Sequence, residues 1–294
     1  MLEQFVLEQV NQYAADLEER LGGDVMYYFG PTHHLLVKPF RDLIERMATG
    51  DSRREKLCIF IKTGGGSVEP VEKMVDIVRH HYQTVWFFVP DFAMSAGTIF
   101  CMSGDKIFLD YSSSLGPIDP QVTIKENGTD KNVPALGVLE MVEGLIRKSI
   151  DNTISPAEFA ILQNQNLALL SSYQHAKDLS IELAKQWLVK YKFKDWATHR
   201  TDQAKLGLPV TADEKVQRAH EIVSKLANHA LWHSHGRFIG PAILRDALRL
   251  EIDDYSEDNE LRNLIRGYND LLTDLIEQRK YVYYMHDKRK TVEG

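Results

Sequence analysis

Cysteine is scarce in this chain. Only Cys58 and Cys101 occur among its 294 residues, and both lie within apolar runs. Two such residues do not make the disulfide framework of a small secreted domain, and they lack the paired spacing of a cysteine-bound zinc site. We therefore expect both thiols to be small core side chains in a protein of a reducing compartment.

A surplus of basic charge is also missing. The chain carries 35 lysines and arginines against 42 aspartates and glutamates, which gives a formal net charge of -7. No concentrated basic face offsets this balance. The composition therefore argues against a nucleic-acid partner.

Long apolar runs are absent as well. No run reaches the roughly 20 residues that a membrane-spanning helix needs. The first residues hold an acidic side chain and no basic one, unlike the start of a secretory signal. We expect a cytoplasmic protein without a membrane span, and we find neither an internal repeat nor a low-complexity segment.

Phosphate-binding glycine motifs are missing too, although a triple-glycine turn is present. Gly64–Gly66 follows an apolar run at 57–61, but its surroundings match neither the dinucleotide fingerprint nor the GxxxxGK[ST] loop. We expect no cofactor here. Such a turn can instead bring backbone N–H groups close to a reacting carbonyl oxygen, or it can serve tight-turn geometry alone.

The apolar pattern predicts an α/β fold. Residues 57–61 and 85–89 are continuous apolar runs typical of strands covered on both faces, and residues 68–78 between them have helical spacing. This order indicates a βαβ unit with a parallel sheet. An amphipathic helix over 5–21 precedes the unit, and Gly22-Gly23 ends that helix.

We divide the chain into three parts. They are an N-terminal helix over 1–22, an α/β domain over 23–212 and a helical C-terminal extension over 213–294. Within them the spacing predicts helices over 135–150 and 156–191. The apolar faces of the helices 5–21 and 259–281 are candidate contact surfaces for another subunit.

The segment from Pro90 to Phe100 joins the second predicted strand to the next helix. It passes from the apolar run into small residues and then into an apolar helix start. Ser95 would lie at the N-terminal end of this helix, where free N–H groups and the positive end of the dipole favour a developing oxyanion. The alternative is that Ser95 only caps the helix.

Together, the glycine turn and the serine turn resemble those of the Clp/crotonase-like serine proteases. Each follows a predicted parallel strand, one βαβ crossover apart. The closer resemblance is to the SDH-type family, the serine dehydrogenase proteinases, and it covers residues 20–212. Four segments carry it: Gly64-Gly65-Gly66-Ser67, Ser95-Ala96-Gly97-Thr98, Leu115-Gly116-Pro117-Ile118-Asp119-Pro120-Gln121, and Trp196-Ala197-Thr198-His199 before Leu206-Gly207-Leu208-Pro209-Val210.

The resemblance implies a ClpP/crotonase-like fold of repeated ββα units and a serine peptidase that acts on peptide or protein substrates. By the same resemblance Ser95 is the nucleophile, and the N–H groups of Gly66 and Ala96 form the oxyanion hole. Clp-fold proteins bury apolar faces by forming rings, so the resemblance also implies a homo-oligomer.

The general base has several candidates. In Clp proteases a histidine follows the serine helix and an acid precedes a later glycine turn, whereas the matching places here hold Asp119 and His199. We therefore hypothesise a Ser95/His199/Asp119 triad, with His199 as base and Asp119 orienting it. SppA-like members use a lysine base, for which Lys131 is the candidate. A third candidate is His235, which would have to fold back over the cleft.

Two other functions share this fold. One is a crotonase-type acyl-CoA enzyme, which places acid/base glutamates around its substrate, but no glutamate occurs between Ser95 and Lys125. The other is a non-catalytic oligomeric scaffold. This alternative stays because the position of the catalytic histidine in Clp proteases holds a different residue here.

Overall fold

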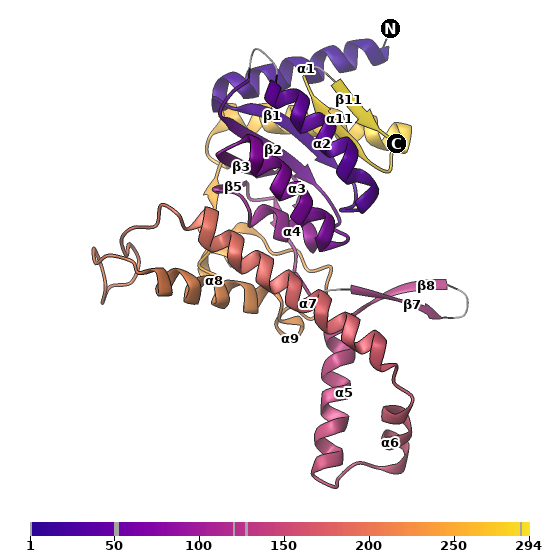
Figure 1. Cartoon of the computed structure of the whole chain (residues 1–294). Coiled ribbons are helices and arrows are strands. Elements are labelled where there is room, and N and C mark those ends of the chain that lie inside the picture. The colour runs from indigo at the N-terminus through magenta and orange to yellow at the C-terminus, as the bar shows by residue number, and fades with distance from the viewer. Residues whose placement is uncertain (1, 50–52, 120, 127–128, 289) are drawn as a thin grey trace.

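A parallel sheet forms the centre of the computed structural model, which describes residues 2–49, 53–119, 121–126, 129–288 and 290–294. Its strands are β1 (Asp24–Phe29), β2 (Lys56–Lys62), β3 (Thr84–Val89), β5 (Lys106–Leu109), β9 (Asp253–Asp254), β10 (Tyr284–Asp287) and β11 (Lys290–Glu293). Among the described residues the sheet has seven strands in the order β11-β10-β1-β2-β3-β5-β9 (Figure 1). The five strands from β1 to β9 are parallel, while β10 and β11 are antiparallel to their neighbours.

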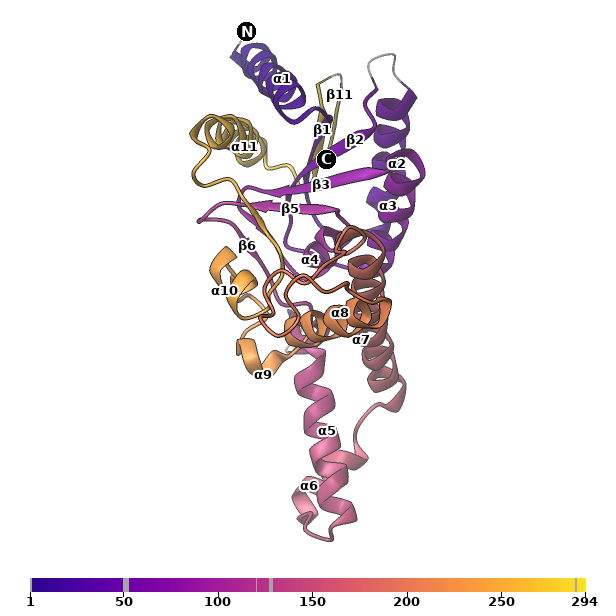
Figure 2. The same ribbon diagram turned by 90° about the vertical axis from the view of Figure 1, so that its left-hand side faces the viewer.

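Helices cover both faces of the sheet, as the continuous apolar runs predict. In β2, Ile59 and Ile61 belong to the same buried cluster as residues of α2 (His34–Thr49), α3 (Val68–His81) and α4 (Ala96–Cys101). Phe60 points the other way, into a cluster with α1 (Leu2–Leu21) and α11 (Asn259–Arg279). Figure 2 shows these two helix layers on opposite sides of the strands. The α/β fold class with a mostly parallel sheet is confirmed.

A second, smaller ladder of backbone pairs crosses one end of the sheet. It includes β4 (Phe92–Ala93) and β6 (Ser114–Leu115), which pair in parallel. The rungs are Thr32 with Gly66, Thr63 with Ala93, Ala93 with Leu115, and Leu115 with Ile239. Strands β1, β2 and β3 are therefore each followed by a short extended segment and then a helix, which is the repeated ββα unit that the resemblance implies.

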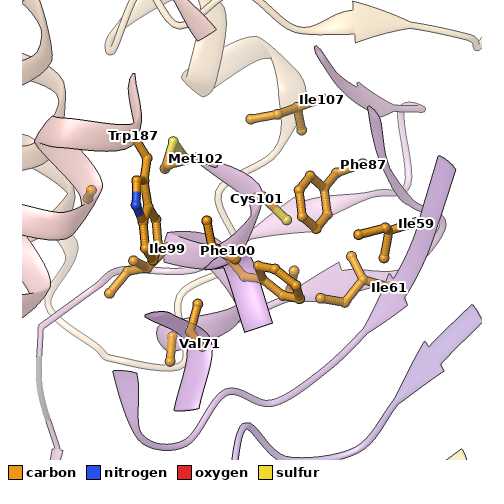
Figure 3. Packing of buried hydrophobic residues seen from close by; sticks show 14 of the residues in the cluster. Ile59, Ile61, Val71, Phe87, Ile99, Phe100, Cys101, Met102, Ile107 and Trp187 are labelled. Carbon is orange, nitrogen blue, oxygen red and sulfur yellow. The ribbon is translucent and has the colours of Figure 1, made fainter. Parts of the chain in front are cut away.

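Helix α4 lies entirely within the core. All six of its residues are buried. Phe100 lies edge-on to Phe87 of β3 with ring centroids 4.9 Å apart, and Trp187 of α7 (Leu167–Trp187) lies beside Ile99 (Figure 3). Full burial of an aromatic side chain such as Phe100 is worth roughly 1.5–3 kcal/mol. The packing fixes the helix that follows Ser95.

The two cysteines are buried and free, which confirms them as core side chains. Burial raises the pKa of the Cys58 thiol to about 12 and raises that of Cys101 as well.

The C-terminal region is more than a helical extension. Besides α8 (Ala212–Leu226), α9 (His229–Trp232), α10 (Pro241–Asp246) and α11, it supplies β9, β10 and β11 to the main sheet. The sequence predicts the helical character of this region but not these three strands. Helices α1 and α11 also share one buried cluster over the sheet. Their apolar faces, which we expected to meet another subunit, are used within the chain.

An arm projects from this body (Figures 1 and 2). It consists of the hairpin β7 (Gln121–Glu126) and β8 (Thr129–Pro134), then α5 (Ala135–Ile150), α6 (Pro156–Gln163) and the first part of α7. The single helix predicted over 156–191 is wrong, because α6 ends at Gln163 and Asn166 caps α7 by accepting from the N–H of Leu169. A π-helical turn, η1 (Leu188–Lys192), continues α7.

The arm exposes much apolar surface. Its buried cluster joins Leu139 and Tyr173, with Val138 and Leu170 packed against them. Large apolar side chains lie exposed around it: Met141, Ile146, Ile150, Phe159, Ile161, Leu167 and Leu169. Among the described helices, none combines the length and apolarity needed to cross a membrane.

Candidate active site

Ser95 occupies a strained turn between β4 and α4. Its backbone angles are φ 52° and ψ -122°, and its side chain makes no capping hydrogen bond. A residue with a Cβ adopts such angles at a cost of about 1–3 kcal/mol, which the surrounding packing must offset. The strand-to-helix turn therefore presents a partly exposed hydroxyl that is not used as a cap, in the manner of a nucleophile elbow.

Close packing behind Ser95 holds this turn. The N–H of Gly97 donates to the carbonyl of Met94 at 2.8 Å, and a Cβ on Gly97 would lie 2.3 Å from Thr63 Cγ2. The buried hydroxyl of Thr98 donates to the carbonyl of Ala93 at 2.7 Å and accepts from the N–H of Gly116 at 2.9 Å. The residue after β6 is thus tied to the serine turn.

The glycine turn meets the serine turn directly. Gly65 has a φ of +92°, and a Cβ at this position would lie 2.6 Å from the carbonyl oxygen of Met94 and 2.7 Å from Ser95 Cβ. The predicted proximity of the two turns is therefore present in the backbone.

Gly66 is held by its rung with Thr32. The N–H of Thr32 donates to Gly65 and the N–H of Ser67 donates to Thr32, both at 2.9 Å. Because these bonds use the residues on either side of Gly66, its own N–H points away from Thr32. The N–H of Ala96 is the first in α4, where helix geometry leaves donors without an intrahelical partner.

Asp119 is fully buried and faces two histidines of the C-terminal region. Its Oδ1 lies 2.9 Å from Nδ1 of His235, and its Oδ2 lies 3.4 Å from Nδ1 of His229. The sequence makes His235 a third candidate for the base and gives no signal for His229. Neither contact could be found from spacing, because the histidines lie far along the chain from the acid.

His199 lies in a different environment. Its Nε2 is 3.3 Å from Oε1 of Glu214, and its ring packs edge-on against Trp196. Hydrogen bonds from Lys205 and from the backbone of Thr211 lower the pKa of Glu214 to about 2, so this partner is a carboxylate. His199 therefore contacts the carboxylate that caps the N-terminus of α8.

The hypothesised pairing of His199 with Asp119 is not among the described contacts. Residues 198–209 close on themselves through the bridge between Thr198 and Pro209, and this loop holds His199 against Glu214. The described contacts of Asp119 go instead to His229 and His235.

Lys131, the other candidate base, lies in β8 opposite Ile124. Its side chain lies outside what the structure describes. Among the side chains that the structure describes, no group of three or more His, Cys, Asp or Glu residues is placed to hold a metal ion.

A family model matches most of the chain. The model of the ClpP-like SDH-type serine proteinases covers residues 44–228. The matched part includes Ser95, Asp119 and His199, and it ends before His229 and His235.

Two curated relatives are uncharacterized proteins of Methanocaldococcus jannaschii. One is 32% identical over 131 residues, which is 42% of this chain and 43% of the relative. The other is 27% identical over 96 residues, which is 33% of this chain and 30% of the relative. The chain thus spans less than half the length of these relatives.

Two solved structures show partial similarity. A membrane-bound stomatin-specific protease is 20% identical, with 42% of this chain and 61% of that chain covered at a TM-score of 0.31. The ClpP protease catalytic domain from Plasmodium falciparum is 11% identical, with 51% and 81% covered at a TM-score of 0.28. Overlaps of this extent assign no residue of the site.

Proposed function

Because the chain belongs to the family of ClpP-like SDH-type serine proteinases, we propose that it is a peptidase that cleaves peptide bonds by acyl transfer to Ser95. One observation carries this proposal: Ser95 holds strained angles of φ 52° and ψ -122° at the start of a buried helix, with no capping bond from its side chain. A serine that only capped the helix would gain nothing from this strain.

The oxyanion hole in this proposal consists of the N–H groups of Gly66 and Ala96. The direction of the Gly66 N–H away from Thr32 and the position of Ala96 at the first turn of α4 support it. The close approach of Gly65 to Ser95 also supports this assignment, because it puts the glycine turn against the serine turn. Two such donors would stabilise the negative oxygen that develops as the substrate carbonyl becomes tetrahedral.

The reaction then follows the usual two steps of acyl transfer. Ser95 Oγ bonds to the carbonyl carbon of the substrate while a base takes its proton, and the C–N bond breaks as the amine receives that proton. Water next attacks the acyl ester, the base removes a proton from the water, and Ser95 regains its hydrogen. The net change is hydrolysis of one peptide bond.

Self-association is the second part of the proposal. The arm carries large apolar side chains that have no cover within the described chain, and contiguous exposed apolar surface of this kind is typical of interaction sites. We place the contact between copies on the arm, because the faces of α1 and α11 are already packed against the sheet.

The nucleophile is tested by covalent labelling. The full chain is incubated with a fluorophosphonate, and the labelled peptide is identified by mass spectrometry. We expect one label on Ser95 and no label on Ser95→Ala, together with loss of peptide cleavage by that variant. Labelling that survives in Ser95→Ala would contradict the proposal. An unaltered protein that neither labels nor cleaves a broad peptide mixture would favour the non-catalytic scaffold.

A further inference from the structure

The last rung of the smaller ladder places the C-terminal region beside Asp119. The N–H of Leu115 donates to the carbonyl of Ile239 at 3.1 Å, and the N–H of Ile239 donates back at 2.8 Å. The two segments run antiparallel. Asp119 follows Leu115 by as many residues as His235 precedes Ile239, so the two side chains come from matched positions of an antiparallel pair.

The next pair of the ladder places the segment from Leu115 to Asp119 beside the serine turn. Ala93 pairs in parallel with Leu115, which puts Ser95 level with the residue two positions before Asp119. Gly116 packs on the serine turn, because a Cβ there would lie 3.1 Å from Met94 Cα. The segment after His235 also reaches this strand, since the ring of Phe238 lies 6.2 Å from that of Phe92.

The contact between Asp119 and His235 has the chemistry of an oriented base. A buried carboxylate needs hydrogen-bond donors, and His235 Nδ1 lies 2.9 Å from its Oδ1. With Asp119 as the acceptor of this bond, the hydrogen lies on Nδ1, which leaves Nε2 as the nitrogen that can accept a proton. The exposed fraction of the Asp119 side chain is 0%, against 21% for His235, so the acid is shielded while the imidazole is accessible.

We propose that His235 is the general base of Ser95 and that Asp119 is the residue that positions it. This inference rests on the proposed function. His235 Nε2 takes the proton from Ser95 Oγ as the acyl bond forms and gives it to the leaving amine, and Asp119 stays ionised throughout. The base therefore comes from a segment that follows the family match, which ends at residue 228.

His229 is the nearest competitor for this role. Its Nδ1 lies 3.4 Å from the other oxygen of Asp119, but this buried nitrogen has no hydrogen-bond partner among the described residues. The hydrogen bond that fixes tautomer and orientation is made by His235. His229 faces the same acid without being oriented by it.

The test compares the rate of fluorophosphonate labelling of Ser95 across histidine variants of the full chain. We expect His235→Ala to slow labelling by roughly a hundredfold or more, the usual contribution of general base catalysis. Added imidazole should restore part of the rate, which a purely structural role would not allow. His199→Ala and His229→Ala, the matched controls, should label at close to the rate of the unaltered protein.

Asp119 is tested through its coupling to His235. Asp119→Asn should slow labelling in the unaltered background and change little in the His235→Ala background, because it acts through the imidazole. Thermal melting of each variant checks that it folds. The assignment of the base would be overturned if His235→Ala labelled at an unchanged rate, or if His229→Ala lost labelling instead. Either result would still leave Ser95 as the nucleophile. Absence of labelling in the unaltered protein would overturn the proposed function itself.

Discussion

Gly65 and Ser95 touch so closely that a side chain on Gly65 would lie 2.7 Å from Ser95 Cβ. Two turns that follow different strands thus form a single packed unit. The relationship makes the glycine a structural requirement of the serine turn, and the chain contains a neighbouring glycine against which this can be measured.

Gly65→Ala should lower both the stability of the fold and the proposed peptidase activity. The new Cβ would also meet the carbonyl of Met94 at 2.6 Å, and a φ of +92° strains any residue with a Cβ. We expect a loss of roughly 1–3 kcal/mol in the free energy of unfolding. Because displacement of the turn also moves an oxyanion donor, we expect a fall in turnover of roughly a hundredfold or more.

Gly64→Ala is the matched control for this change. A Cβ on Gly64 would meet no atom within 4 Å. Urea unfolding and peptide hydrolysis should both stay close to those of the unaltered protein. Equal losses in the two variants would show that the glycine run is merely intolerant of side chains, against our interpretation.

Ser95→Gly should stabilise the fold while abolishing activity. Glycine adopts a φ of 52° with ψ -122° without the strain that serine bears. We expect the free energy of unfolding to rise by roughly 1 kcal/mol relative to Ser95→Ala, which keeps a Cβ. Chemical unfolding of the two inactive variants measures this difference. A Ser95→Gly protein no more stable than Ser95→Ala would mean that the turn stores no strain.

His286 should make the fold sensitive to acid. The ring is buried between Tyr268, whose hydroxyl lies 2.9 Å from Nδ1, and Asn11, whose Oδ1 lies 3.0 Å from Nε2. Burial lowers the pKa of His286 to about 4, although Asp287 acts in the opposite direction. The unfolded chain takes up a proton below about pH 6.5 while the folded chain does not, so stability is lost as the pH falls from about 6.5 to about 4.

The size of this effect is at most about 3 kcal/mol, from the shift between the two states. Urea unfolding of the unaltered protein and of His286→Gln at several pH values measures it. The variant should be less stable at neutral pH and show a shallower decline toward acid. Parallel declines in the two proteins would assign the acid sensitivity to other groups.

The arm should govern self-association. Charged substitutions at Met141, Ile150 and Leu167, whose exposed fractions are 64%, 73% and 78%, should lower the mass measured by sedimentation. Folding stability should change little, because exposed substitutions usually stay within about 0.5 kcal/mol. Val216→Glu, an equally charged change on the body at a 53% exposed residue, is the control. A monomeric unaltered protein would contradict the oligomer.

Local patterns predicted the part of the site that depends on neighbouring elements. The runs at 57–61 and 85–89 are buried on both faces, so their continuous apolar character marks parallel strands. The turns after them must then lie at the same edge of the sheet. This reasoning brings Gly66 and Ser95 together without any knowledge of distant contacts.

Distant contacts account for what we did not predict. The pairing of Asp119 with His235 depends on one rung between Leu115 and Ile239, and single residues leave no periodic signal. The strand at 284–287 mixes polar and aromatic residues. The buried His286 and Asp287 bond to Asn11 and Arg46, distant partners that the sequence does not reveal. The break at 164–166 was hidden because asparagine is compatible with a helix interior and is also a good cap.

The position of β10 beside β1 bears on how the enzyme is made. Strand β1 precedes Ser95 in the chain, and in the described part of the chain one of its edges is paired with residues 284–287. During synthesis this edge and the sheet face beneath α11 stay open until residues 259–287 have left the ribosome. A nascent chain that already contains Ser95 therefore lacks a finished sheet until residues 259–287 have emerged, so the proposed peptidase activity is withheld until then.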